Sequence, residues 1–92
     1  MKTAQLIAID GTTTEISPAH GHHFKLQELY FLLGCRYIEI AHLDDGRLMI
    51  IDEEGKLKAG HRINQKATDM YRPSVDYIVG RALVCDASML ET

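Results

Sequence analysis

The segment from Arg36 to Asp52 constrains the fold of this chain most strongly. Residues 36–43 are rich in β-branched and aromatic residues, including Tyr37, Ile38 and Ile40, and residues 47–52 form a second apolar run. Asp-Asp-Gly separates the two runs at residues 44–46, and an Asp-Gly pair between such runs is a strong hairpin signal. The sequence therefore predicts that these runs pair as antiparallel strands.

The first third of the chain predicts a second hairpin followed by a helix. Residues 2–10 alternate with apolar side chains on both faces, which is typical of an inner strand, and residues 12–17 suit an exposed return strand. From Phe24 to Leu33 the apolar residues take helical spacing. Gly34 follows, where a helix C-cap favours a residue with positive φ.

The last third predicts a short helix and a final strand. Asn64 is a good N-cap for a helix that runs to about Tyr71. Residues 76–85 have the character of a strand, and Gly80 inside it suggests a bulge or the close approach of another backbone. Residues 86–92 have the composition of a frayed C-terminal tail.

The element order is ββ-α-ββ-α-β, which predicts an α+β fold in one domain over residues 1–92. We expect a small single-layer, mainly antiparallel sheet of about five strands, with two helices on one of its faces. Such a sheet leaves edges exposed, so self-association into a homo-oligomer is expected.

Composition excludes several classes of protein. Ninety-two residues are too few for two independent cores, and 46% hydrophobic residues are too many for a disordered segment. No apolar stretch approaches the roughly 20 residues that cross a bilayer, and the N-terminus lacks the apolar core of a secretory signal. We therefore expect a cytoplasmic protein without membrane contact, and we interpret Cys35 and Cys85 as buried thiols.

The net charge of −3 hides a strong segregation along the chain. Residues 1–55 contain four basic and nine acidic residues, whereas residues 56–81 contain six basic and two acidic ones. An acidic chain argues against nucleic acid as a partner. The segregation instead suits electrostatically steered contacts with another molecule.

Three histidines close to the start of the first helix, His20, His22 and His23, are the candidate metal ligands. A built zinc site needs three or four converging ligands, and no carboxylate or cysteine nearby has the spacing to complete one. We favour a solvated polar loop and expect neither a metal nor a cofactor.

Two charged segments are candidate interaction sites. Asp52, Glu53 and Glu54 form a polar turn that we interpret as an exposed interaction surface. A basic group surrounds the start of the second helix, where helix N–H groups favour anions. This candidate anion site consists of Lys58, His61, Arg62, Asn64 and Lys66. The alternative interpretation of both segments is that they are ordinary solvated charges.

Several short runs resemble one protein family. They are Tyr37–Ile40, Ile51–Leu57, Ile63–Thr68 and Ile78–Val84. In this order they resemble the domain of unknown function 3846 family, small proteins of bacteria, phages and other mobile elements. The resemblance covers about residues 24–85. It implies a biological context and no biochemical activity.

These observations predict a non-enzymatic accessory protein of phage or mobile-element type that binds a host protein or assembles with itself. No phosphate-loop, dinucleotide-binding or hydrolase motif is present in the sequence. The alternative is a binder that sequesters an anionic, nucleotide-like small molecule at the basic start of the second helix.

Overall fold

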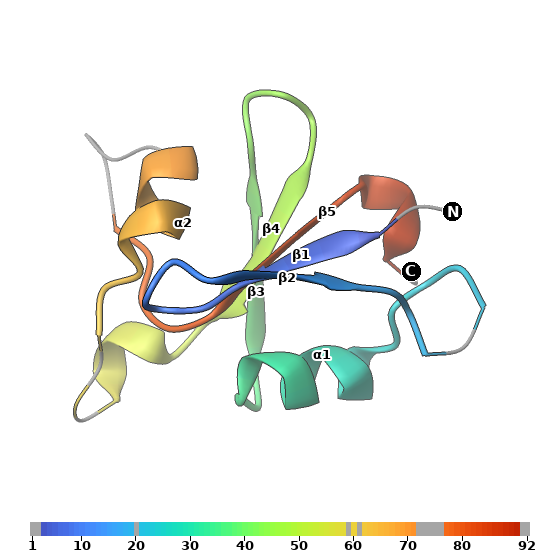
Figure 1. The fold of residues 1–92 in the computed structure, drawn as a ribbon. Coiled ribbons are helices and arrows are strands. Elements are labelled where there is room, and N and C mark those ends of the chain that lie inside the picture. The colour runs from blue at the N-terminus through green and yellow to red at the C-terminus, as the bar shows by residue number, and fades with distance from the viewer. Residues whose placement is uncertain (1–2, 20, 59, 61, 72–76, 91–92) are drawn as a thin grey trace.

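The computed structural model describes residues 3–19, 21–58, 60, 62–71 and 77–90. Its centre is a five-stranded sheet in the order β2-β1-β5-β4-β3, with every neighbouring pair antiparallel (Figure 1). The strands are β1 (Ala4–Ile7), β2 (Thr13–Ile16), β3 (Ile38–His42), β4 (Leu48–Asp52) and β5 (Ala82–Cys85). The helices are α1 (Leu26–Leu33) and α2 (Gln65–Met70), with 3₁₀ turns η1 (Gly55–Leu57) and η2 (Ala87–Met89). The predicted α+β class and element order are confirmed.

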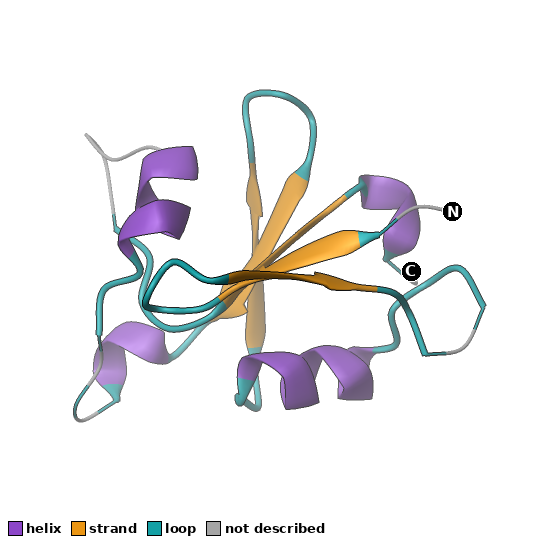
Figure 2. Cartoon of the chain, in the orientation of Figure 1, coloured by secondary structure: helices purple, strands orange, loops and turns teal. Residues whose placement is uncertain are grey.

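The two helices lie on opposite faces of the sheet (Figure 2). Alternate residues of the central strands serve the two faces, as the pleat requires. Two hydrophobic clusters lie on the two faces of the sheet, one beneath α1 and one beneath α2. Ile50 and Leu83 belong to the cluster beneath α1, whereas Met49 and Val84 belong to the cluster beneath α2. The prediction that both helices cover one face is therefore wrong, because the central strands are apolar on both sides and each face needs a cover.

The sheet has buried inner strands and exposed edges. The prediction of an inner strand within residues 2–10 is confirmed for Ala4–Ile7, because β1 lies between β2 and β5. Residues 8–10 lie outside this strand, and residue 2 lies outside the described residues. The apolar run Tyr37–Ile40 does not lie inside the sheet. β3 is an edge strand, and the side chains of Tyr37 and Ile40 are 54% and 42% exposed.

The interpretation of Gly80 changes with the structure. Gly80 precedes β5 instead of interrupting a strand, and its φ of 81° explains the glycine, since a Cβ there would meet nothing within 4 Å. The close backbone approach occurs at Gly55, where a Cβ would lie 3.3 Å from the Val79 carbonyl oxygen. At Gly34 the predicted αL cap is confirmed, with a φ of 64°.

The C-terminal segment is part of the core as far as Leu90. Residues 87–89 form η2, and Met89 is 2% exposed within the cluster beneath α1. The backbone N–H of Phe24 donates to the Met89 carbonyl at 2.7 Å. The prediction of a frayed tail from residue 86 is therefore wrong for residues 86–90, and residues 91–92 lie outside the described part. Across the described residues, no helix is long and apolar enough to cross a bilayer.

Both cysteines are free and buried, as the sequence predicted. Burial in β5 raises the pKa of the Cys85 thiol to about 11 from an ordinary value of 9.0. The thiol is thus held protonated in the folded chain, because the thiolate would lose its hydration.

We predict that Cys85 makes folding stability depend on pH above 9. Its stabilising contribution is complete below the unfolded-state pKa of 9.0 and is lost as pH rises through about 11. That contribution amounts to about 2–3 kcal/mol. Urea unfolding at pH 8 to 11 measures it. The Cys85→Ala variant, which is less stable throughout, should lack this part of the pH slope, and identical slopes for both proteins would contradict the assignment.

Candidate functional site

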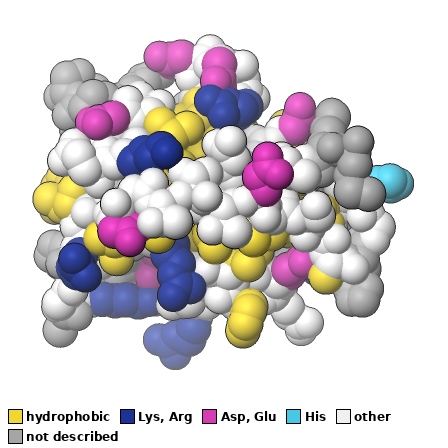
Figure 3. Space-filling model, viewed as in Figure 1, with side chains coloured by type: hydrophobic (Ala, Val, Ile, Leu, Met, Phe, Trp, Pro, Cys, Tyr) yellow, Lys and Arg dark blue, Asp and Glu magenta, His cyan; other side chains and the backbone are white. Residues whose placement is uncertain are grey.

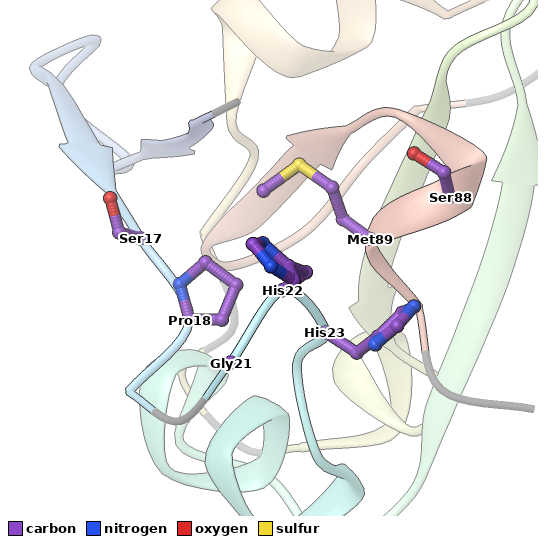
Figure 4. A pocket seen from close by; sticks show the side chains of 7 residues that line it. All are labelled: Ser17, Pro18, Gly21, His22, His23, Ser88 and Met89. Carbon is purple, nitrogen blue, oxygen red and sulfur yellow. The ribbon is translucent and has the colours of Figure 1, made fainter. Parts of the chain in front are cut away.

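The histidine loop borders a hollow of about 520 Å³ between the end of β2 and η2 (Figure 4). Its lining residues are Ser17, Pro18, Gly21, His22, His23, Ser88 and Met89. The His22 and His23 imidazoles do not converge in this view. His20 lies outside the described residues. Among the residues that are described, no three His, Cys, Asp or Glu side chains gather as metal ligands.

The acidic turn after β4 is partly structural. The Asp52 side chain is 9% exposed, forms an ion pair with the Lys58 ammonium and accepts the Glu54 backbone N–H at 2.9 Å. The hydrogen bond that the Lys58 ammonium donates to Asp52 raises the pKa of Lys58. Glu53 is exposed. Of the predicted acidic surface, Asp52 is therefore engaged within the fold, and Glu53 presents its side chain to solvent.

Asn64 is fully buried and has internal partners for its whole side chain. Its Oδ1 accepts the Ala67 N–H at 3.1 Å, which confirms Asn64 as the N-cap of α2. Its Nδ2 donates to the carbonyls of Ile7 at 3.0 Å and Gly80 at 2.9 Å. The side chain thus connects α2 to the end of β1 and to the segment that leads into β5.

The remaining members of the predicted anion site separate. Lys58 and Arg62 line one hollow of about 290 Å³, together with Arg81 and Asp52. Lys66 instead donates to the Thr13 hydroxyl at 2.8 Å, and His61 lies outside the described residues. Figure 3 shows Lys and Arg side chains gathered at the lower left, the region that η1 occupies in Figure 1.

Two cations of this basic hollow complete the C-terminus of α1. Arg81 Nη1 donates to the Leu32 carbonyl at 3.1 Å, and Lys58 Nζ donates to the Gly34 carbonyl at 3.5 Å. The last carbonyls of a helix lack intrahelical donors and carry partial negative charge, so cations there are stabilising. α1 has no basic residue in its own last turn, and residues distant in sequence supply the charge. The sequence interpretation missed Arg81 because no local pattern links it to α1.

The free edge of β3 is a second candidate site. Near the two ends of the β3–β4 ladder, Leu43 N–H donates to the Arg47 carbonyl and Glu53 N–H donates to the Tyr37 carbonyl. Hydrogen-bonded pairs alternate along an antiparallel ladder, so the odd-numbered residues from 37 to 43 direct their backbone groups toward β4. Ile38, Ile40 and His42 consequently direct their N–H and C=O groups toward the free edge.

An apolar groove of about 500 Å³ runs beside this edge, on the face that α1 covers. It is lined by Phe24, Leu26, Leu29, Ile38, Ile40, His42, Leu48, Ala87 and Leu90. Leu26 and Ile40 are 50% and 42% exposed, so the groove opens to solvent. The alternation of Ile38 and Ile40 was visible in the sequence, but only the strand order shows that it belongs to an edge.

Comparison with known proteins places the chain in a family. The profile of the family described as domain of unknown function (DUF3846) matches residues 2–90. The chain belongs to this family. The match is longer than the resemblance over residues 24–85 and includes the first hairpin and η2. No curated protein and no solved structure matched the chain.

In this DUF3846 domain we predict that Asn64 is a major stabilising residue. Asn64→Ala removes the helix cap and leaves the buried Ile7 carbonyl and the partly buried Gly80 carbonyl without this donor. It should lower the free energy of unfolding by about 2–4 kcal/mol. Asn64→Ser retains a cap acceptor and should recover only about 1 kcal/mol of this loss. Urea unfolding measures both. The exposed neighbour is the control, with Gln65→Ala changing stability by less than about 0.5 kcal/mol. If Asn64→Ala lowered the free energy of unfolding by no more than Gln65→Ala does, the stabilising role of Asn64 would be contradicted.

Proposed function

We propose that this DUF3846 domain is a non-enzymatic accessory protein, of phage or mobile-element type, that acts by binding another polypeptide along the β3 edge. One observation carries the proposal. Ile38, Ile40 and His42 direct their backbone hydrogen-bonding groups outward and also line the apolar groove. Backbone pairing along a sheet edge supplies affinity, and side-chain pockets beside the edge supply specificity.

The other edge of the sheet is less suited to binding. β2 has four residues, Thr13–Ile16, of which the first three are exposed and polar. It offers backbone groups with little apolar surface beside them. Natural edge strands are commonly short, polar or charged, which discourages unwanted pairing. β3 departs from this pattern with Ile40 at its centre, and the departure supports a binding role.

The polar groups of the basic hollow also support binding over catalysis. Asp52 pairs with Lys58, and Arg81 donates to the Leu32 carbonyl. The first contact connects the end of β4 to the residue after η1, and the second connects the residue before β5 to α1. Acid–base catalysis commonly uses a pair of groups with unusual pKa values. The structural contacts of these residues account for their positions without such a role.

Site-specific photo-crosslinking in cells that express the chain tests the β3 edge. We expect a photoreactive amino acid in place of Ile40 to give covalent adducts on denaturing gels. The matched control is the same amino acid in place of Phe31, which is 83% exposed and does not line the groove. Adducts at both positions in equal yield, or at neither, would refute binding along β3.

The basic hollow supports the second candidate, an anion binder, because it brings Lys58, Arg62 and Arg81 to one site. Thermal unfolding with inorganic phosphate or a nucleotide as probe tests it. A ligand at a hundred times its Kd stabilises by about 2.7 kcal/mol. Arg62→Ala should abolish the shift while Lys66→Ala, outside the hollow, preserves it. No shift with either probe, or a shift that Arg62→Ala leaves intact, would refute this site.

A further inference from the structure

We infer that the strand that pairs with β3 is β3 of a second copy of this chain, related to the first by a twofold axis through Ile40. The inference rests on the proposed function and names its partner. Twofold pairing of identical strands is antiparallel, and it joins two five-stranded sheets into one continuous sheet.

The positions of the outward backbone groups fix the register. With the axis at Ile40, this residue pairs with Ile40 of the second copy, and Ile38 pairs with His42 of the second copy. All three outward-facing residues of each copy then lie in hydrogen-bonded pairs, and the twofold axis repeats the pair of Ile38 and His42 on both sides of Ile40. No outward N–H or C=O group of the strand is left without a partner.

The neighbouring registers are worse. An axis at Glu39 places that carboxylate directly opposite its own copy, and like charges directly opposite one another destabilise a strand pair. An axis at Ala41 leaves Ile38 opposite the hairpin turn, so its backbone groups lose their strand partner. The axis at Ile40 avoids both faults, because Glu39 then lies opposite Ala41.

The charges that flank β3 match this register. Arg36 and Asp44 are both exposed and lie equally far, in sequence, on either side of Ile40. In the antiparallel pair each Arg36 therefore lies beside Asp44 of the second copy, and symmetry produces this opposite-charge contact at both ends of the interface. Such an arrangement favours one orientation and disfavours a shifted one.

Pairing also covers apolar surface. The side chains of Ile38, Ile40 and His42 lie on the α1 face and border the groove. In the pair the two Ile40 side chains lie next to each other at the axis, and the open sides of the two grooves meet. The half-exposed Leu26 and Ile40 then lose contact with water, which supplies the hydrophobic part of the association.

A charge-exchange experiment tests the register by sedimentation velocity over a range of protein concentrations. The wild-type chain should show a concentration-dependent dimer. Arg36→Asp and Asp44→Arg each place like charges at both ends, so each variant alone should raise the dimer Kd by about tenfold. A mixture of the two variants should form a heterodimer with near wild-type affinity, because opposite charges then meet at both ends.

The mixture distinguishes pairing from misfolding, since unfolded variants would not recover on mixing. A control exchange at Asp45 and Arg47, which form an ion pair within one hairpin, should leave the dimer Kd unchanged. A wild-type chain that stays monomeric at all concentrations would overturn the inference. So would a mixture that associates no better than its components.

Engineered cysteines provide a second measurement. Residues across a strand pair have Cα separations within disulfide range, so Ile40→Cys should form a disulfide-linked dimer under mild oxidation. Phe31→Cys, which is more exposed than Ile40 but away from the axis, should not. Both native thiols are buried. Equal linkage at both positions would overturn the inference.

The mass of the photo-crosslinked adducts separates this inference from the proposed function. Adducts at position 40 of twice the chain mass support both. Adducts of another mass alone would leave binding along β3 in place and overturn the second copy as its partner. The absence of any adduct would overturn both.

Discussion

The buried side-chain amide of Asn64 connects α2 to the end of β1 and to the segment before β5. It caps α2 and donates to carbonyls at the end of β1 and at Gly80. Without this donor the buried Ile7 carbonyl would carry a desolvation cost of about 1–3 kcal/mol, and the partly buried Gly80 carbonyl a smaller one. The position of α2 over the sheet is therefore set by directional hydrogen bonds as well as by apolar contact.

The segment around Asn64 also determines where β5 begins. The Asn64 N–H donates to the Ile78 carbonyl, and the Gly80 N–H donates to the Arg62 carbonyl. The Thr68 hydroxyl donates to the Asn64 carbonyl and accepts the Ile78 N–H. These bonds hold the chain beside α2 until Gly80, whose positive φ redirects it into the sheet. β5 is consequently shorter than the apolar pattern of residues 76–85 suggests.

Features set by local chemistry could be predicted from the sequence. The αL cap at Gly34, the N-cap at Asn64 and the hairpin between β3 and β4 each depend on residues within a few positions of one another. The helix faces and the edge position of β3 depend instead on strand order. β5 inserts between β1 and β4, and no local pattern determines that insertion.

The candidate site shows the same division. The basic segment was visible as a run of lysines and arginines, but its partners were not. Lys58 forms an ion pair with Asp52 and also donates to the Gly34 carbonyl, 24 residues away in sequence. Arg81 donates to the Leu32 carbonyl, 49 residues away. Two basic residues of this segment, Lys58 and Arg81, therefore serve contacts between segments of the chain.

The strands of the sheet differ in what they leave exposed at its edges. α1 and α2 cover the two faces, β1, β5 and β4 are paired on both sides, and β2 is short and polar. β3 differs because it combines outward backbone groups with an open apolar groove. A polypeptide that pairs there satisfies the edge and covers the groove in one step, since the same three residues provide both. In the described fold, no other strand combines outward backbone groups with an apolar groove.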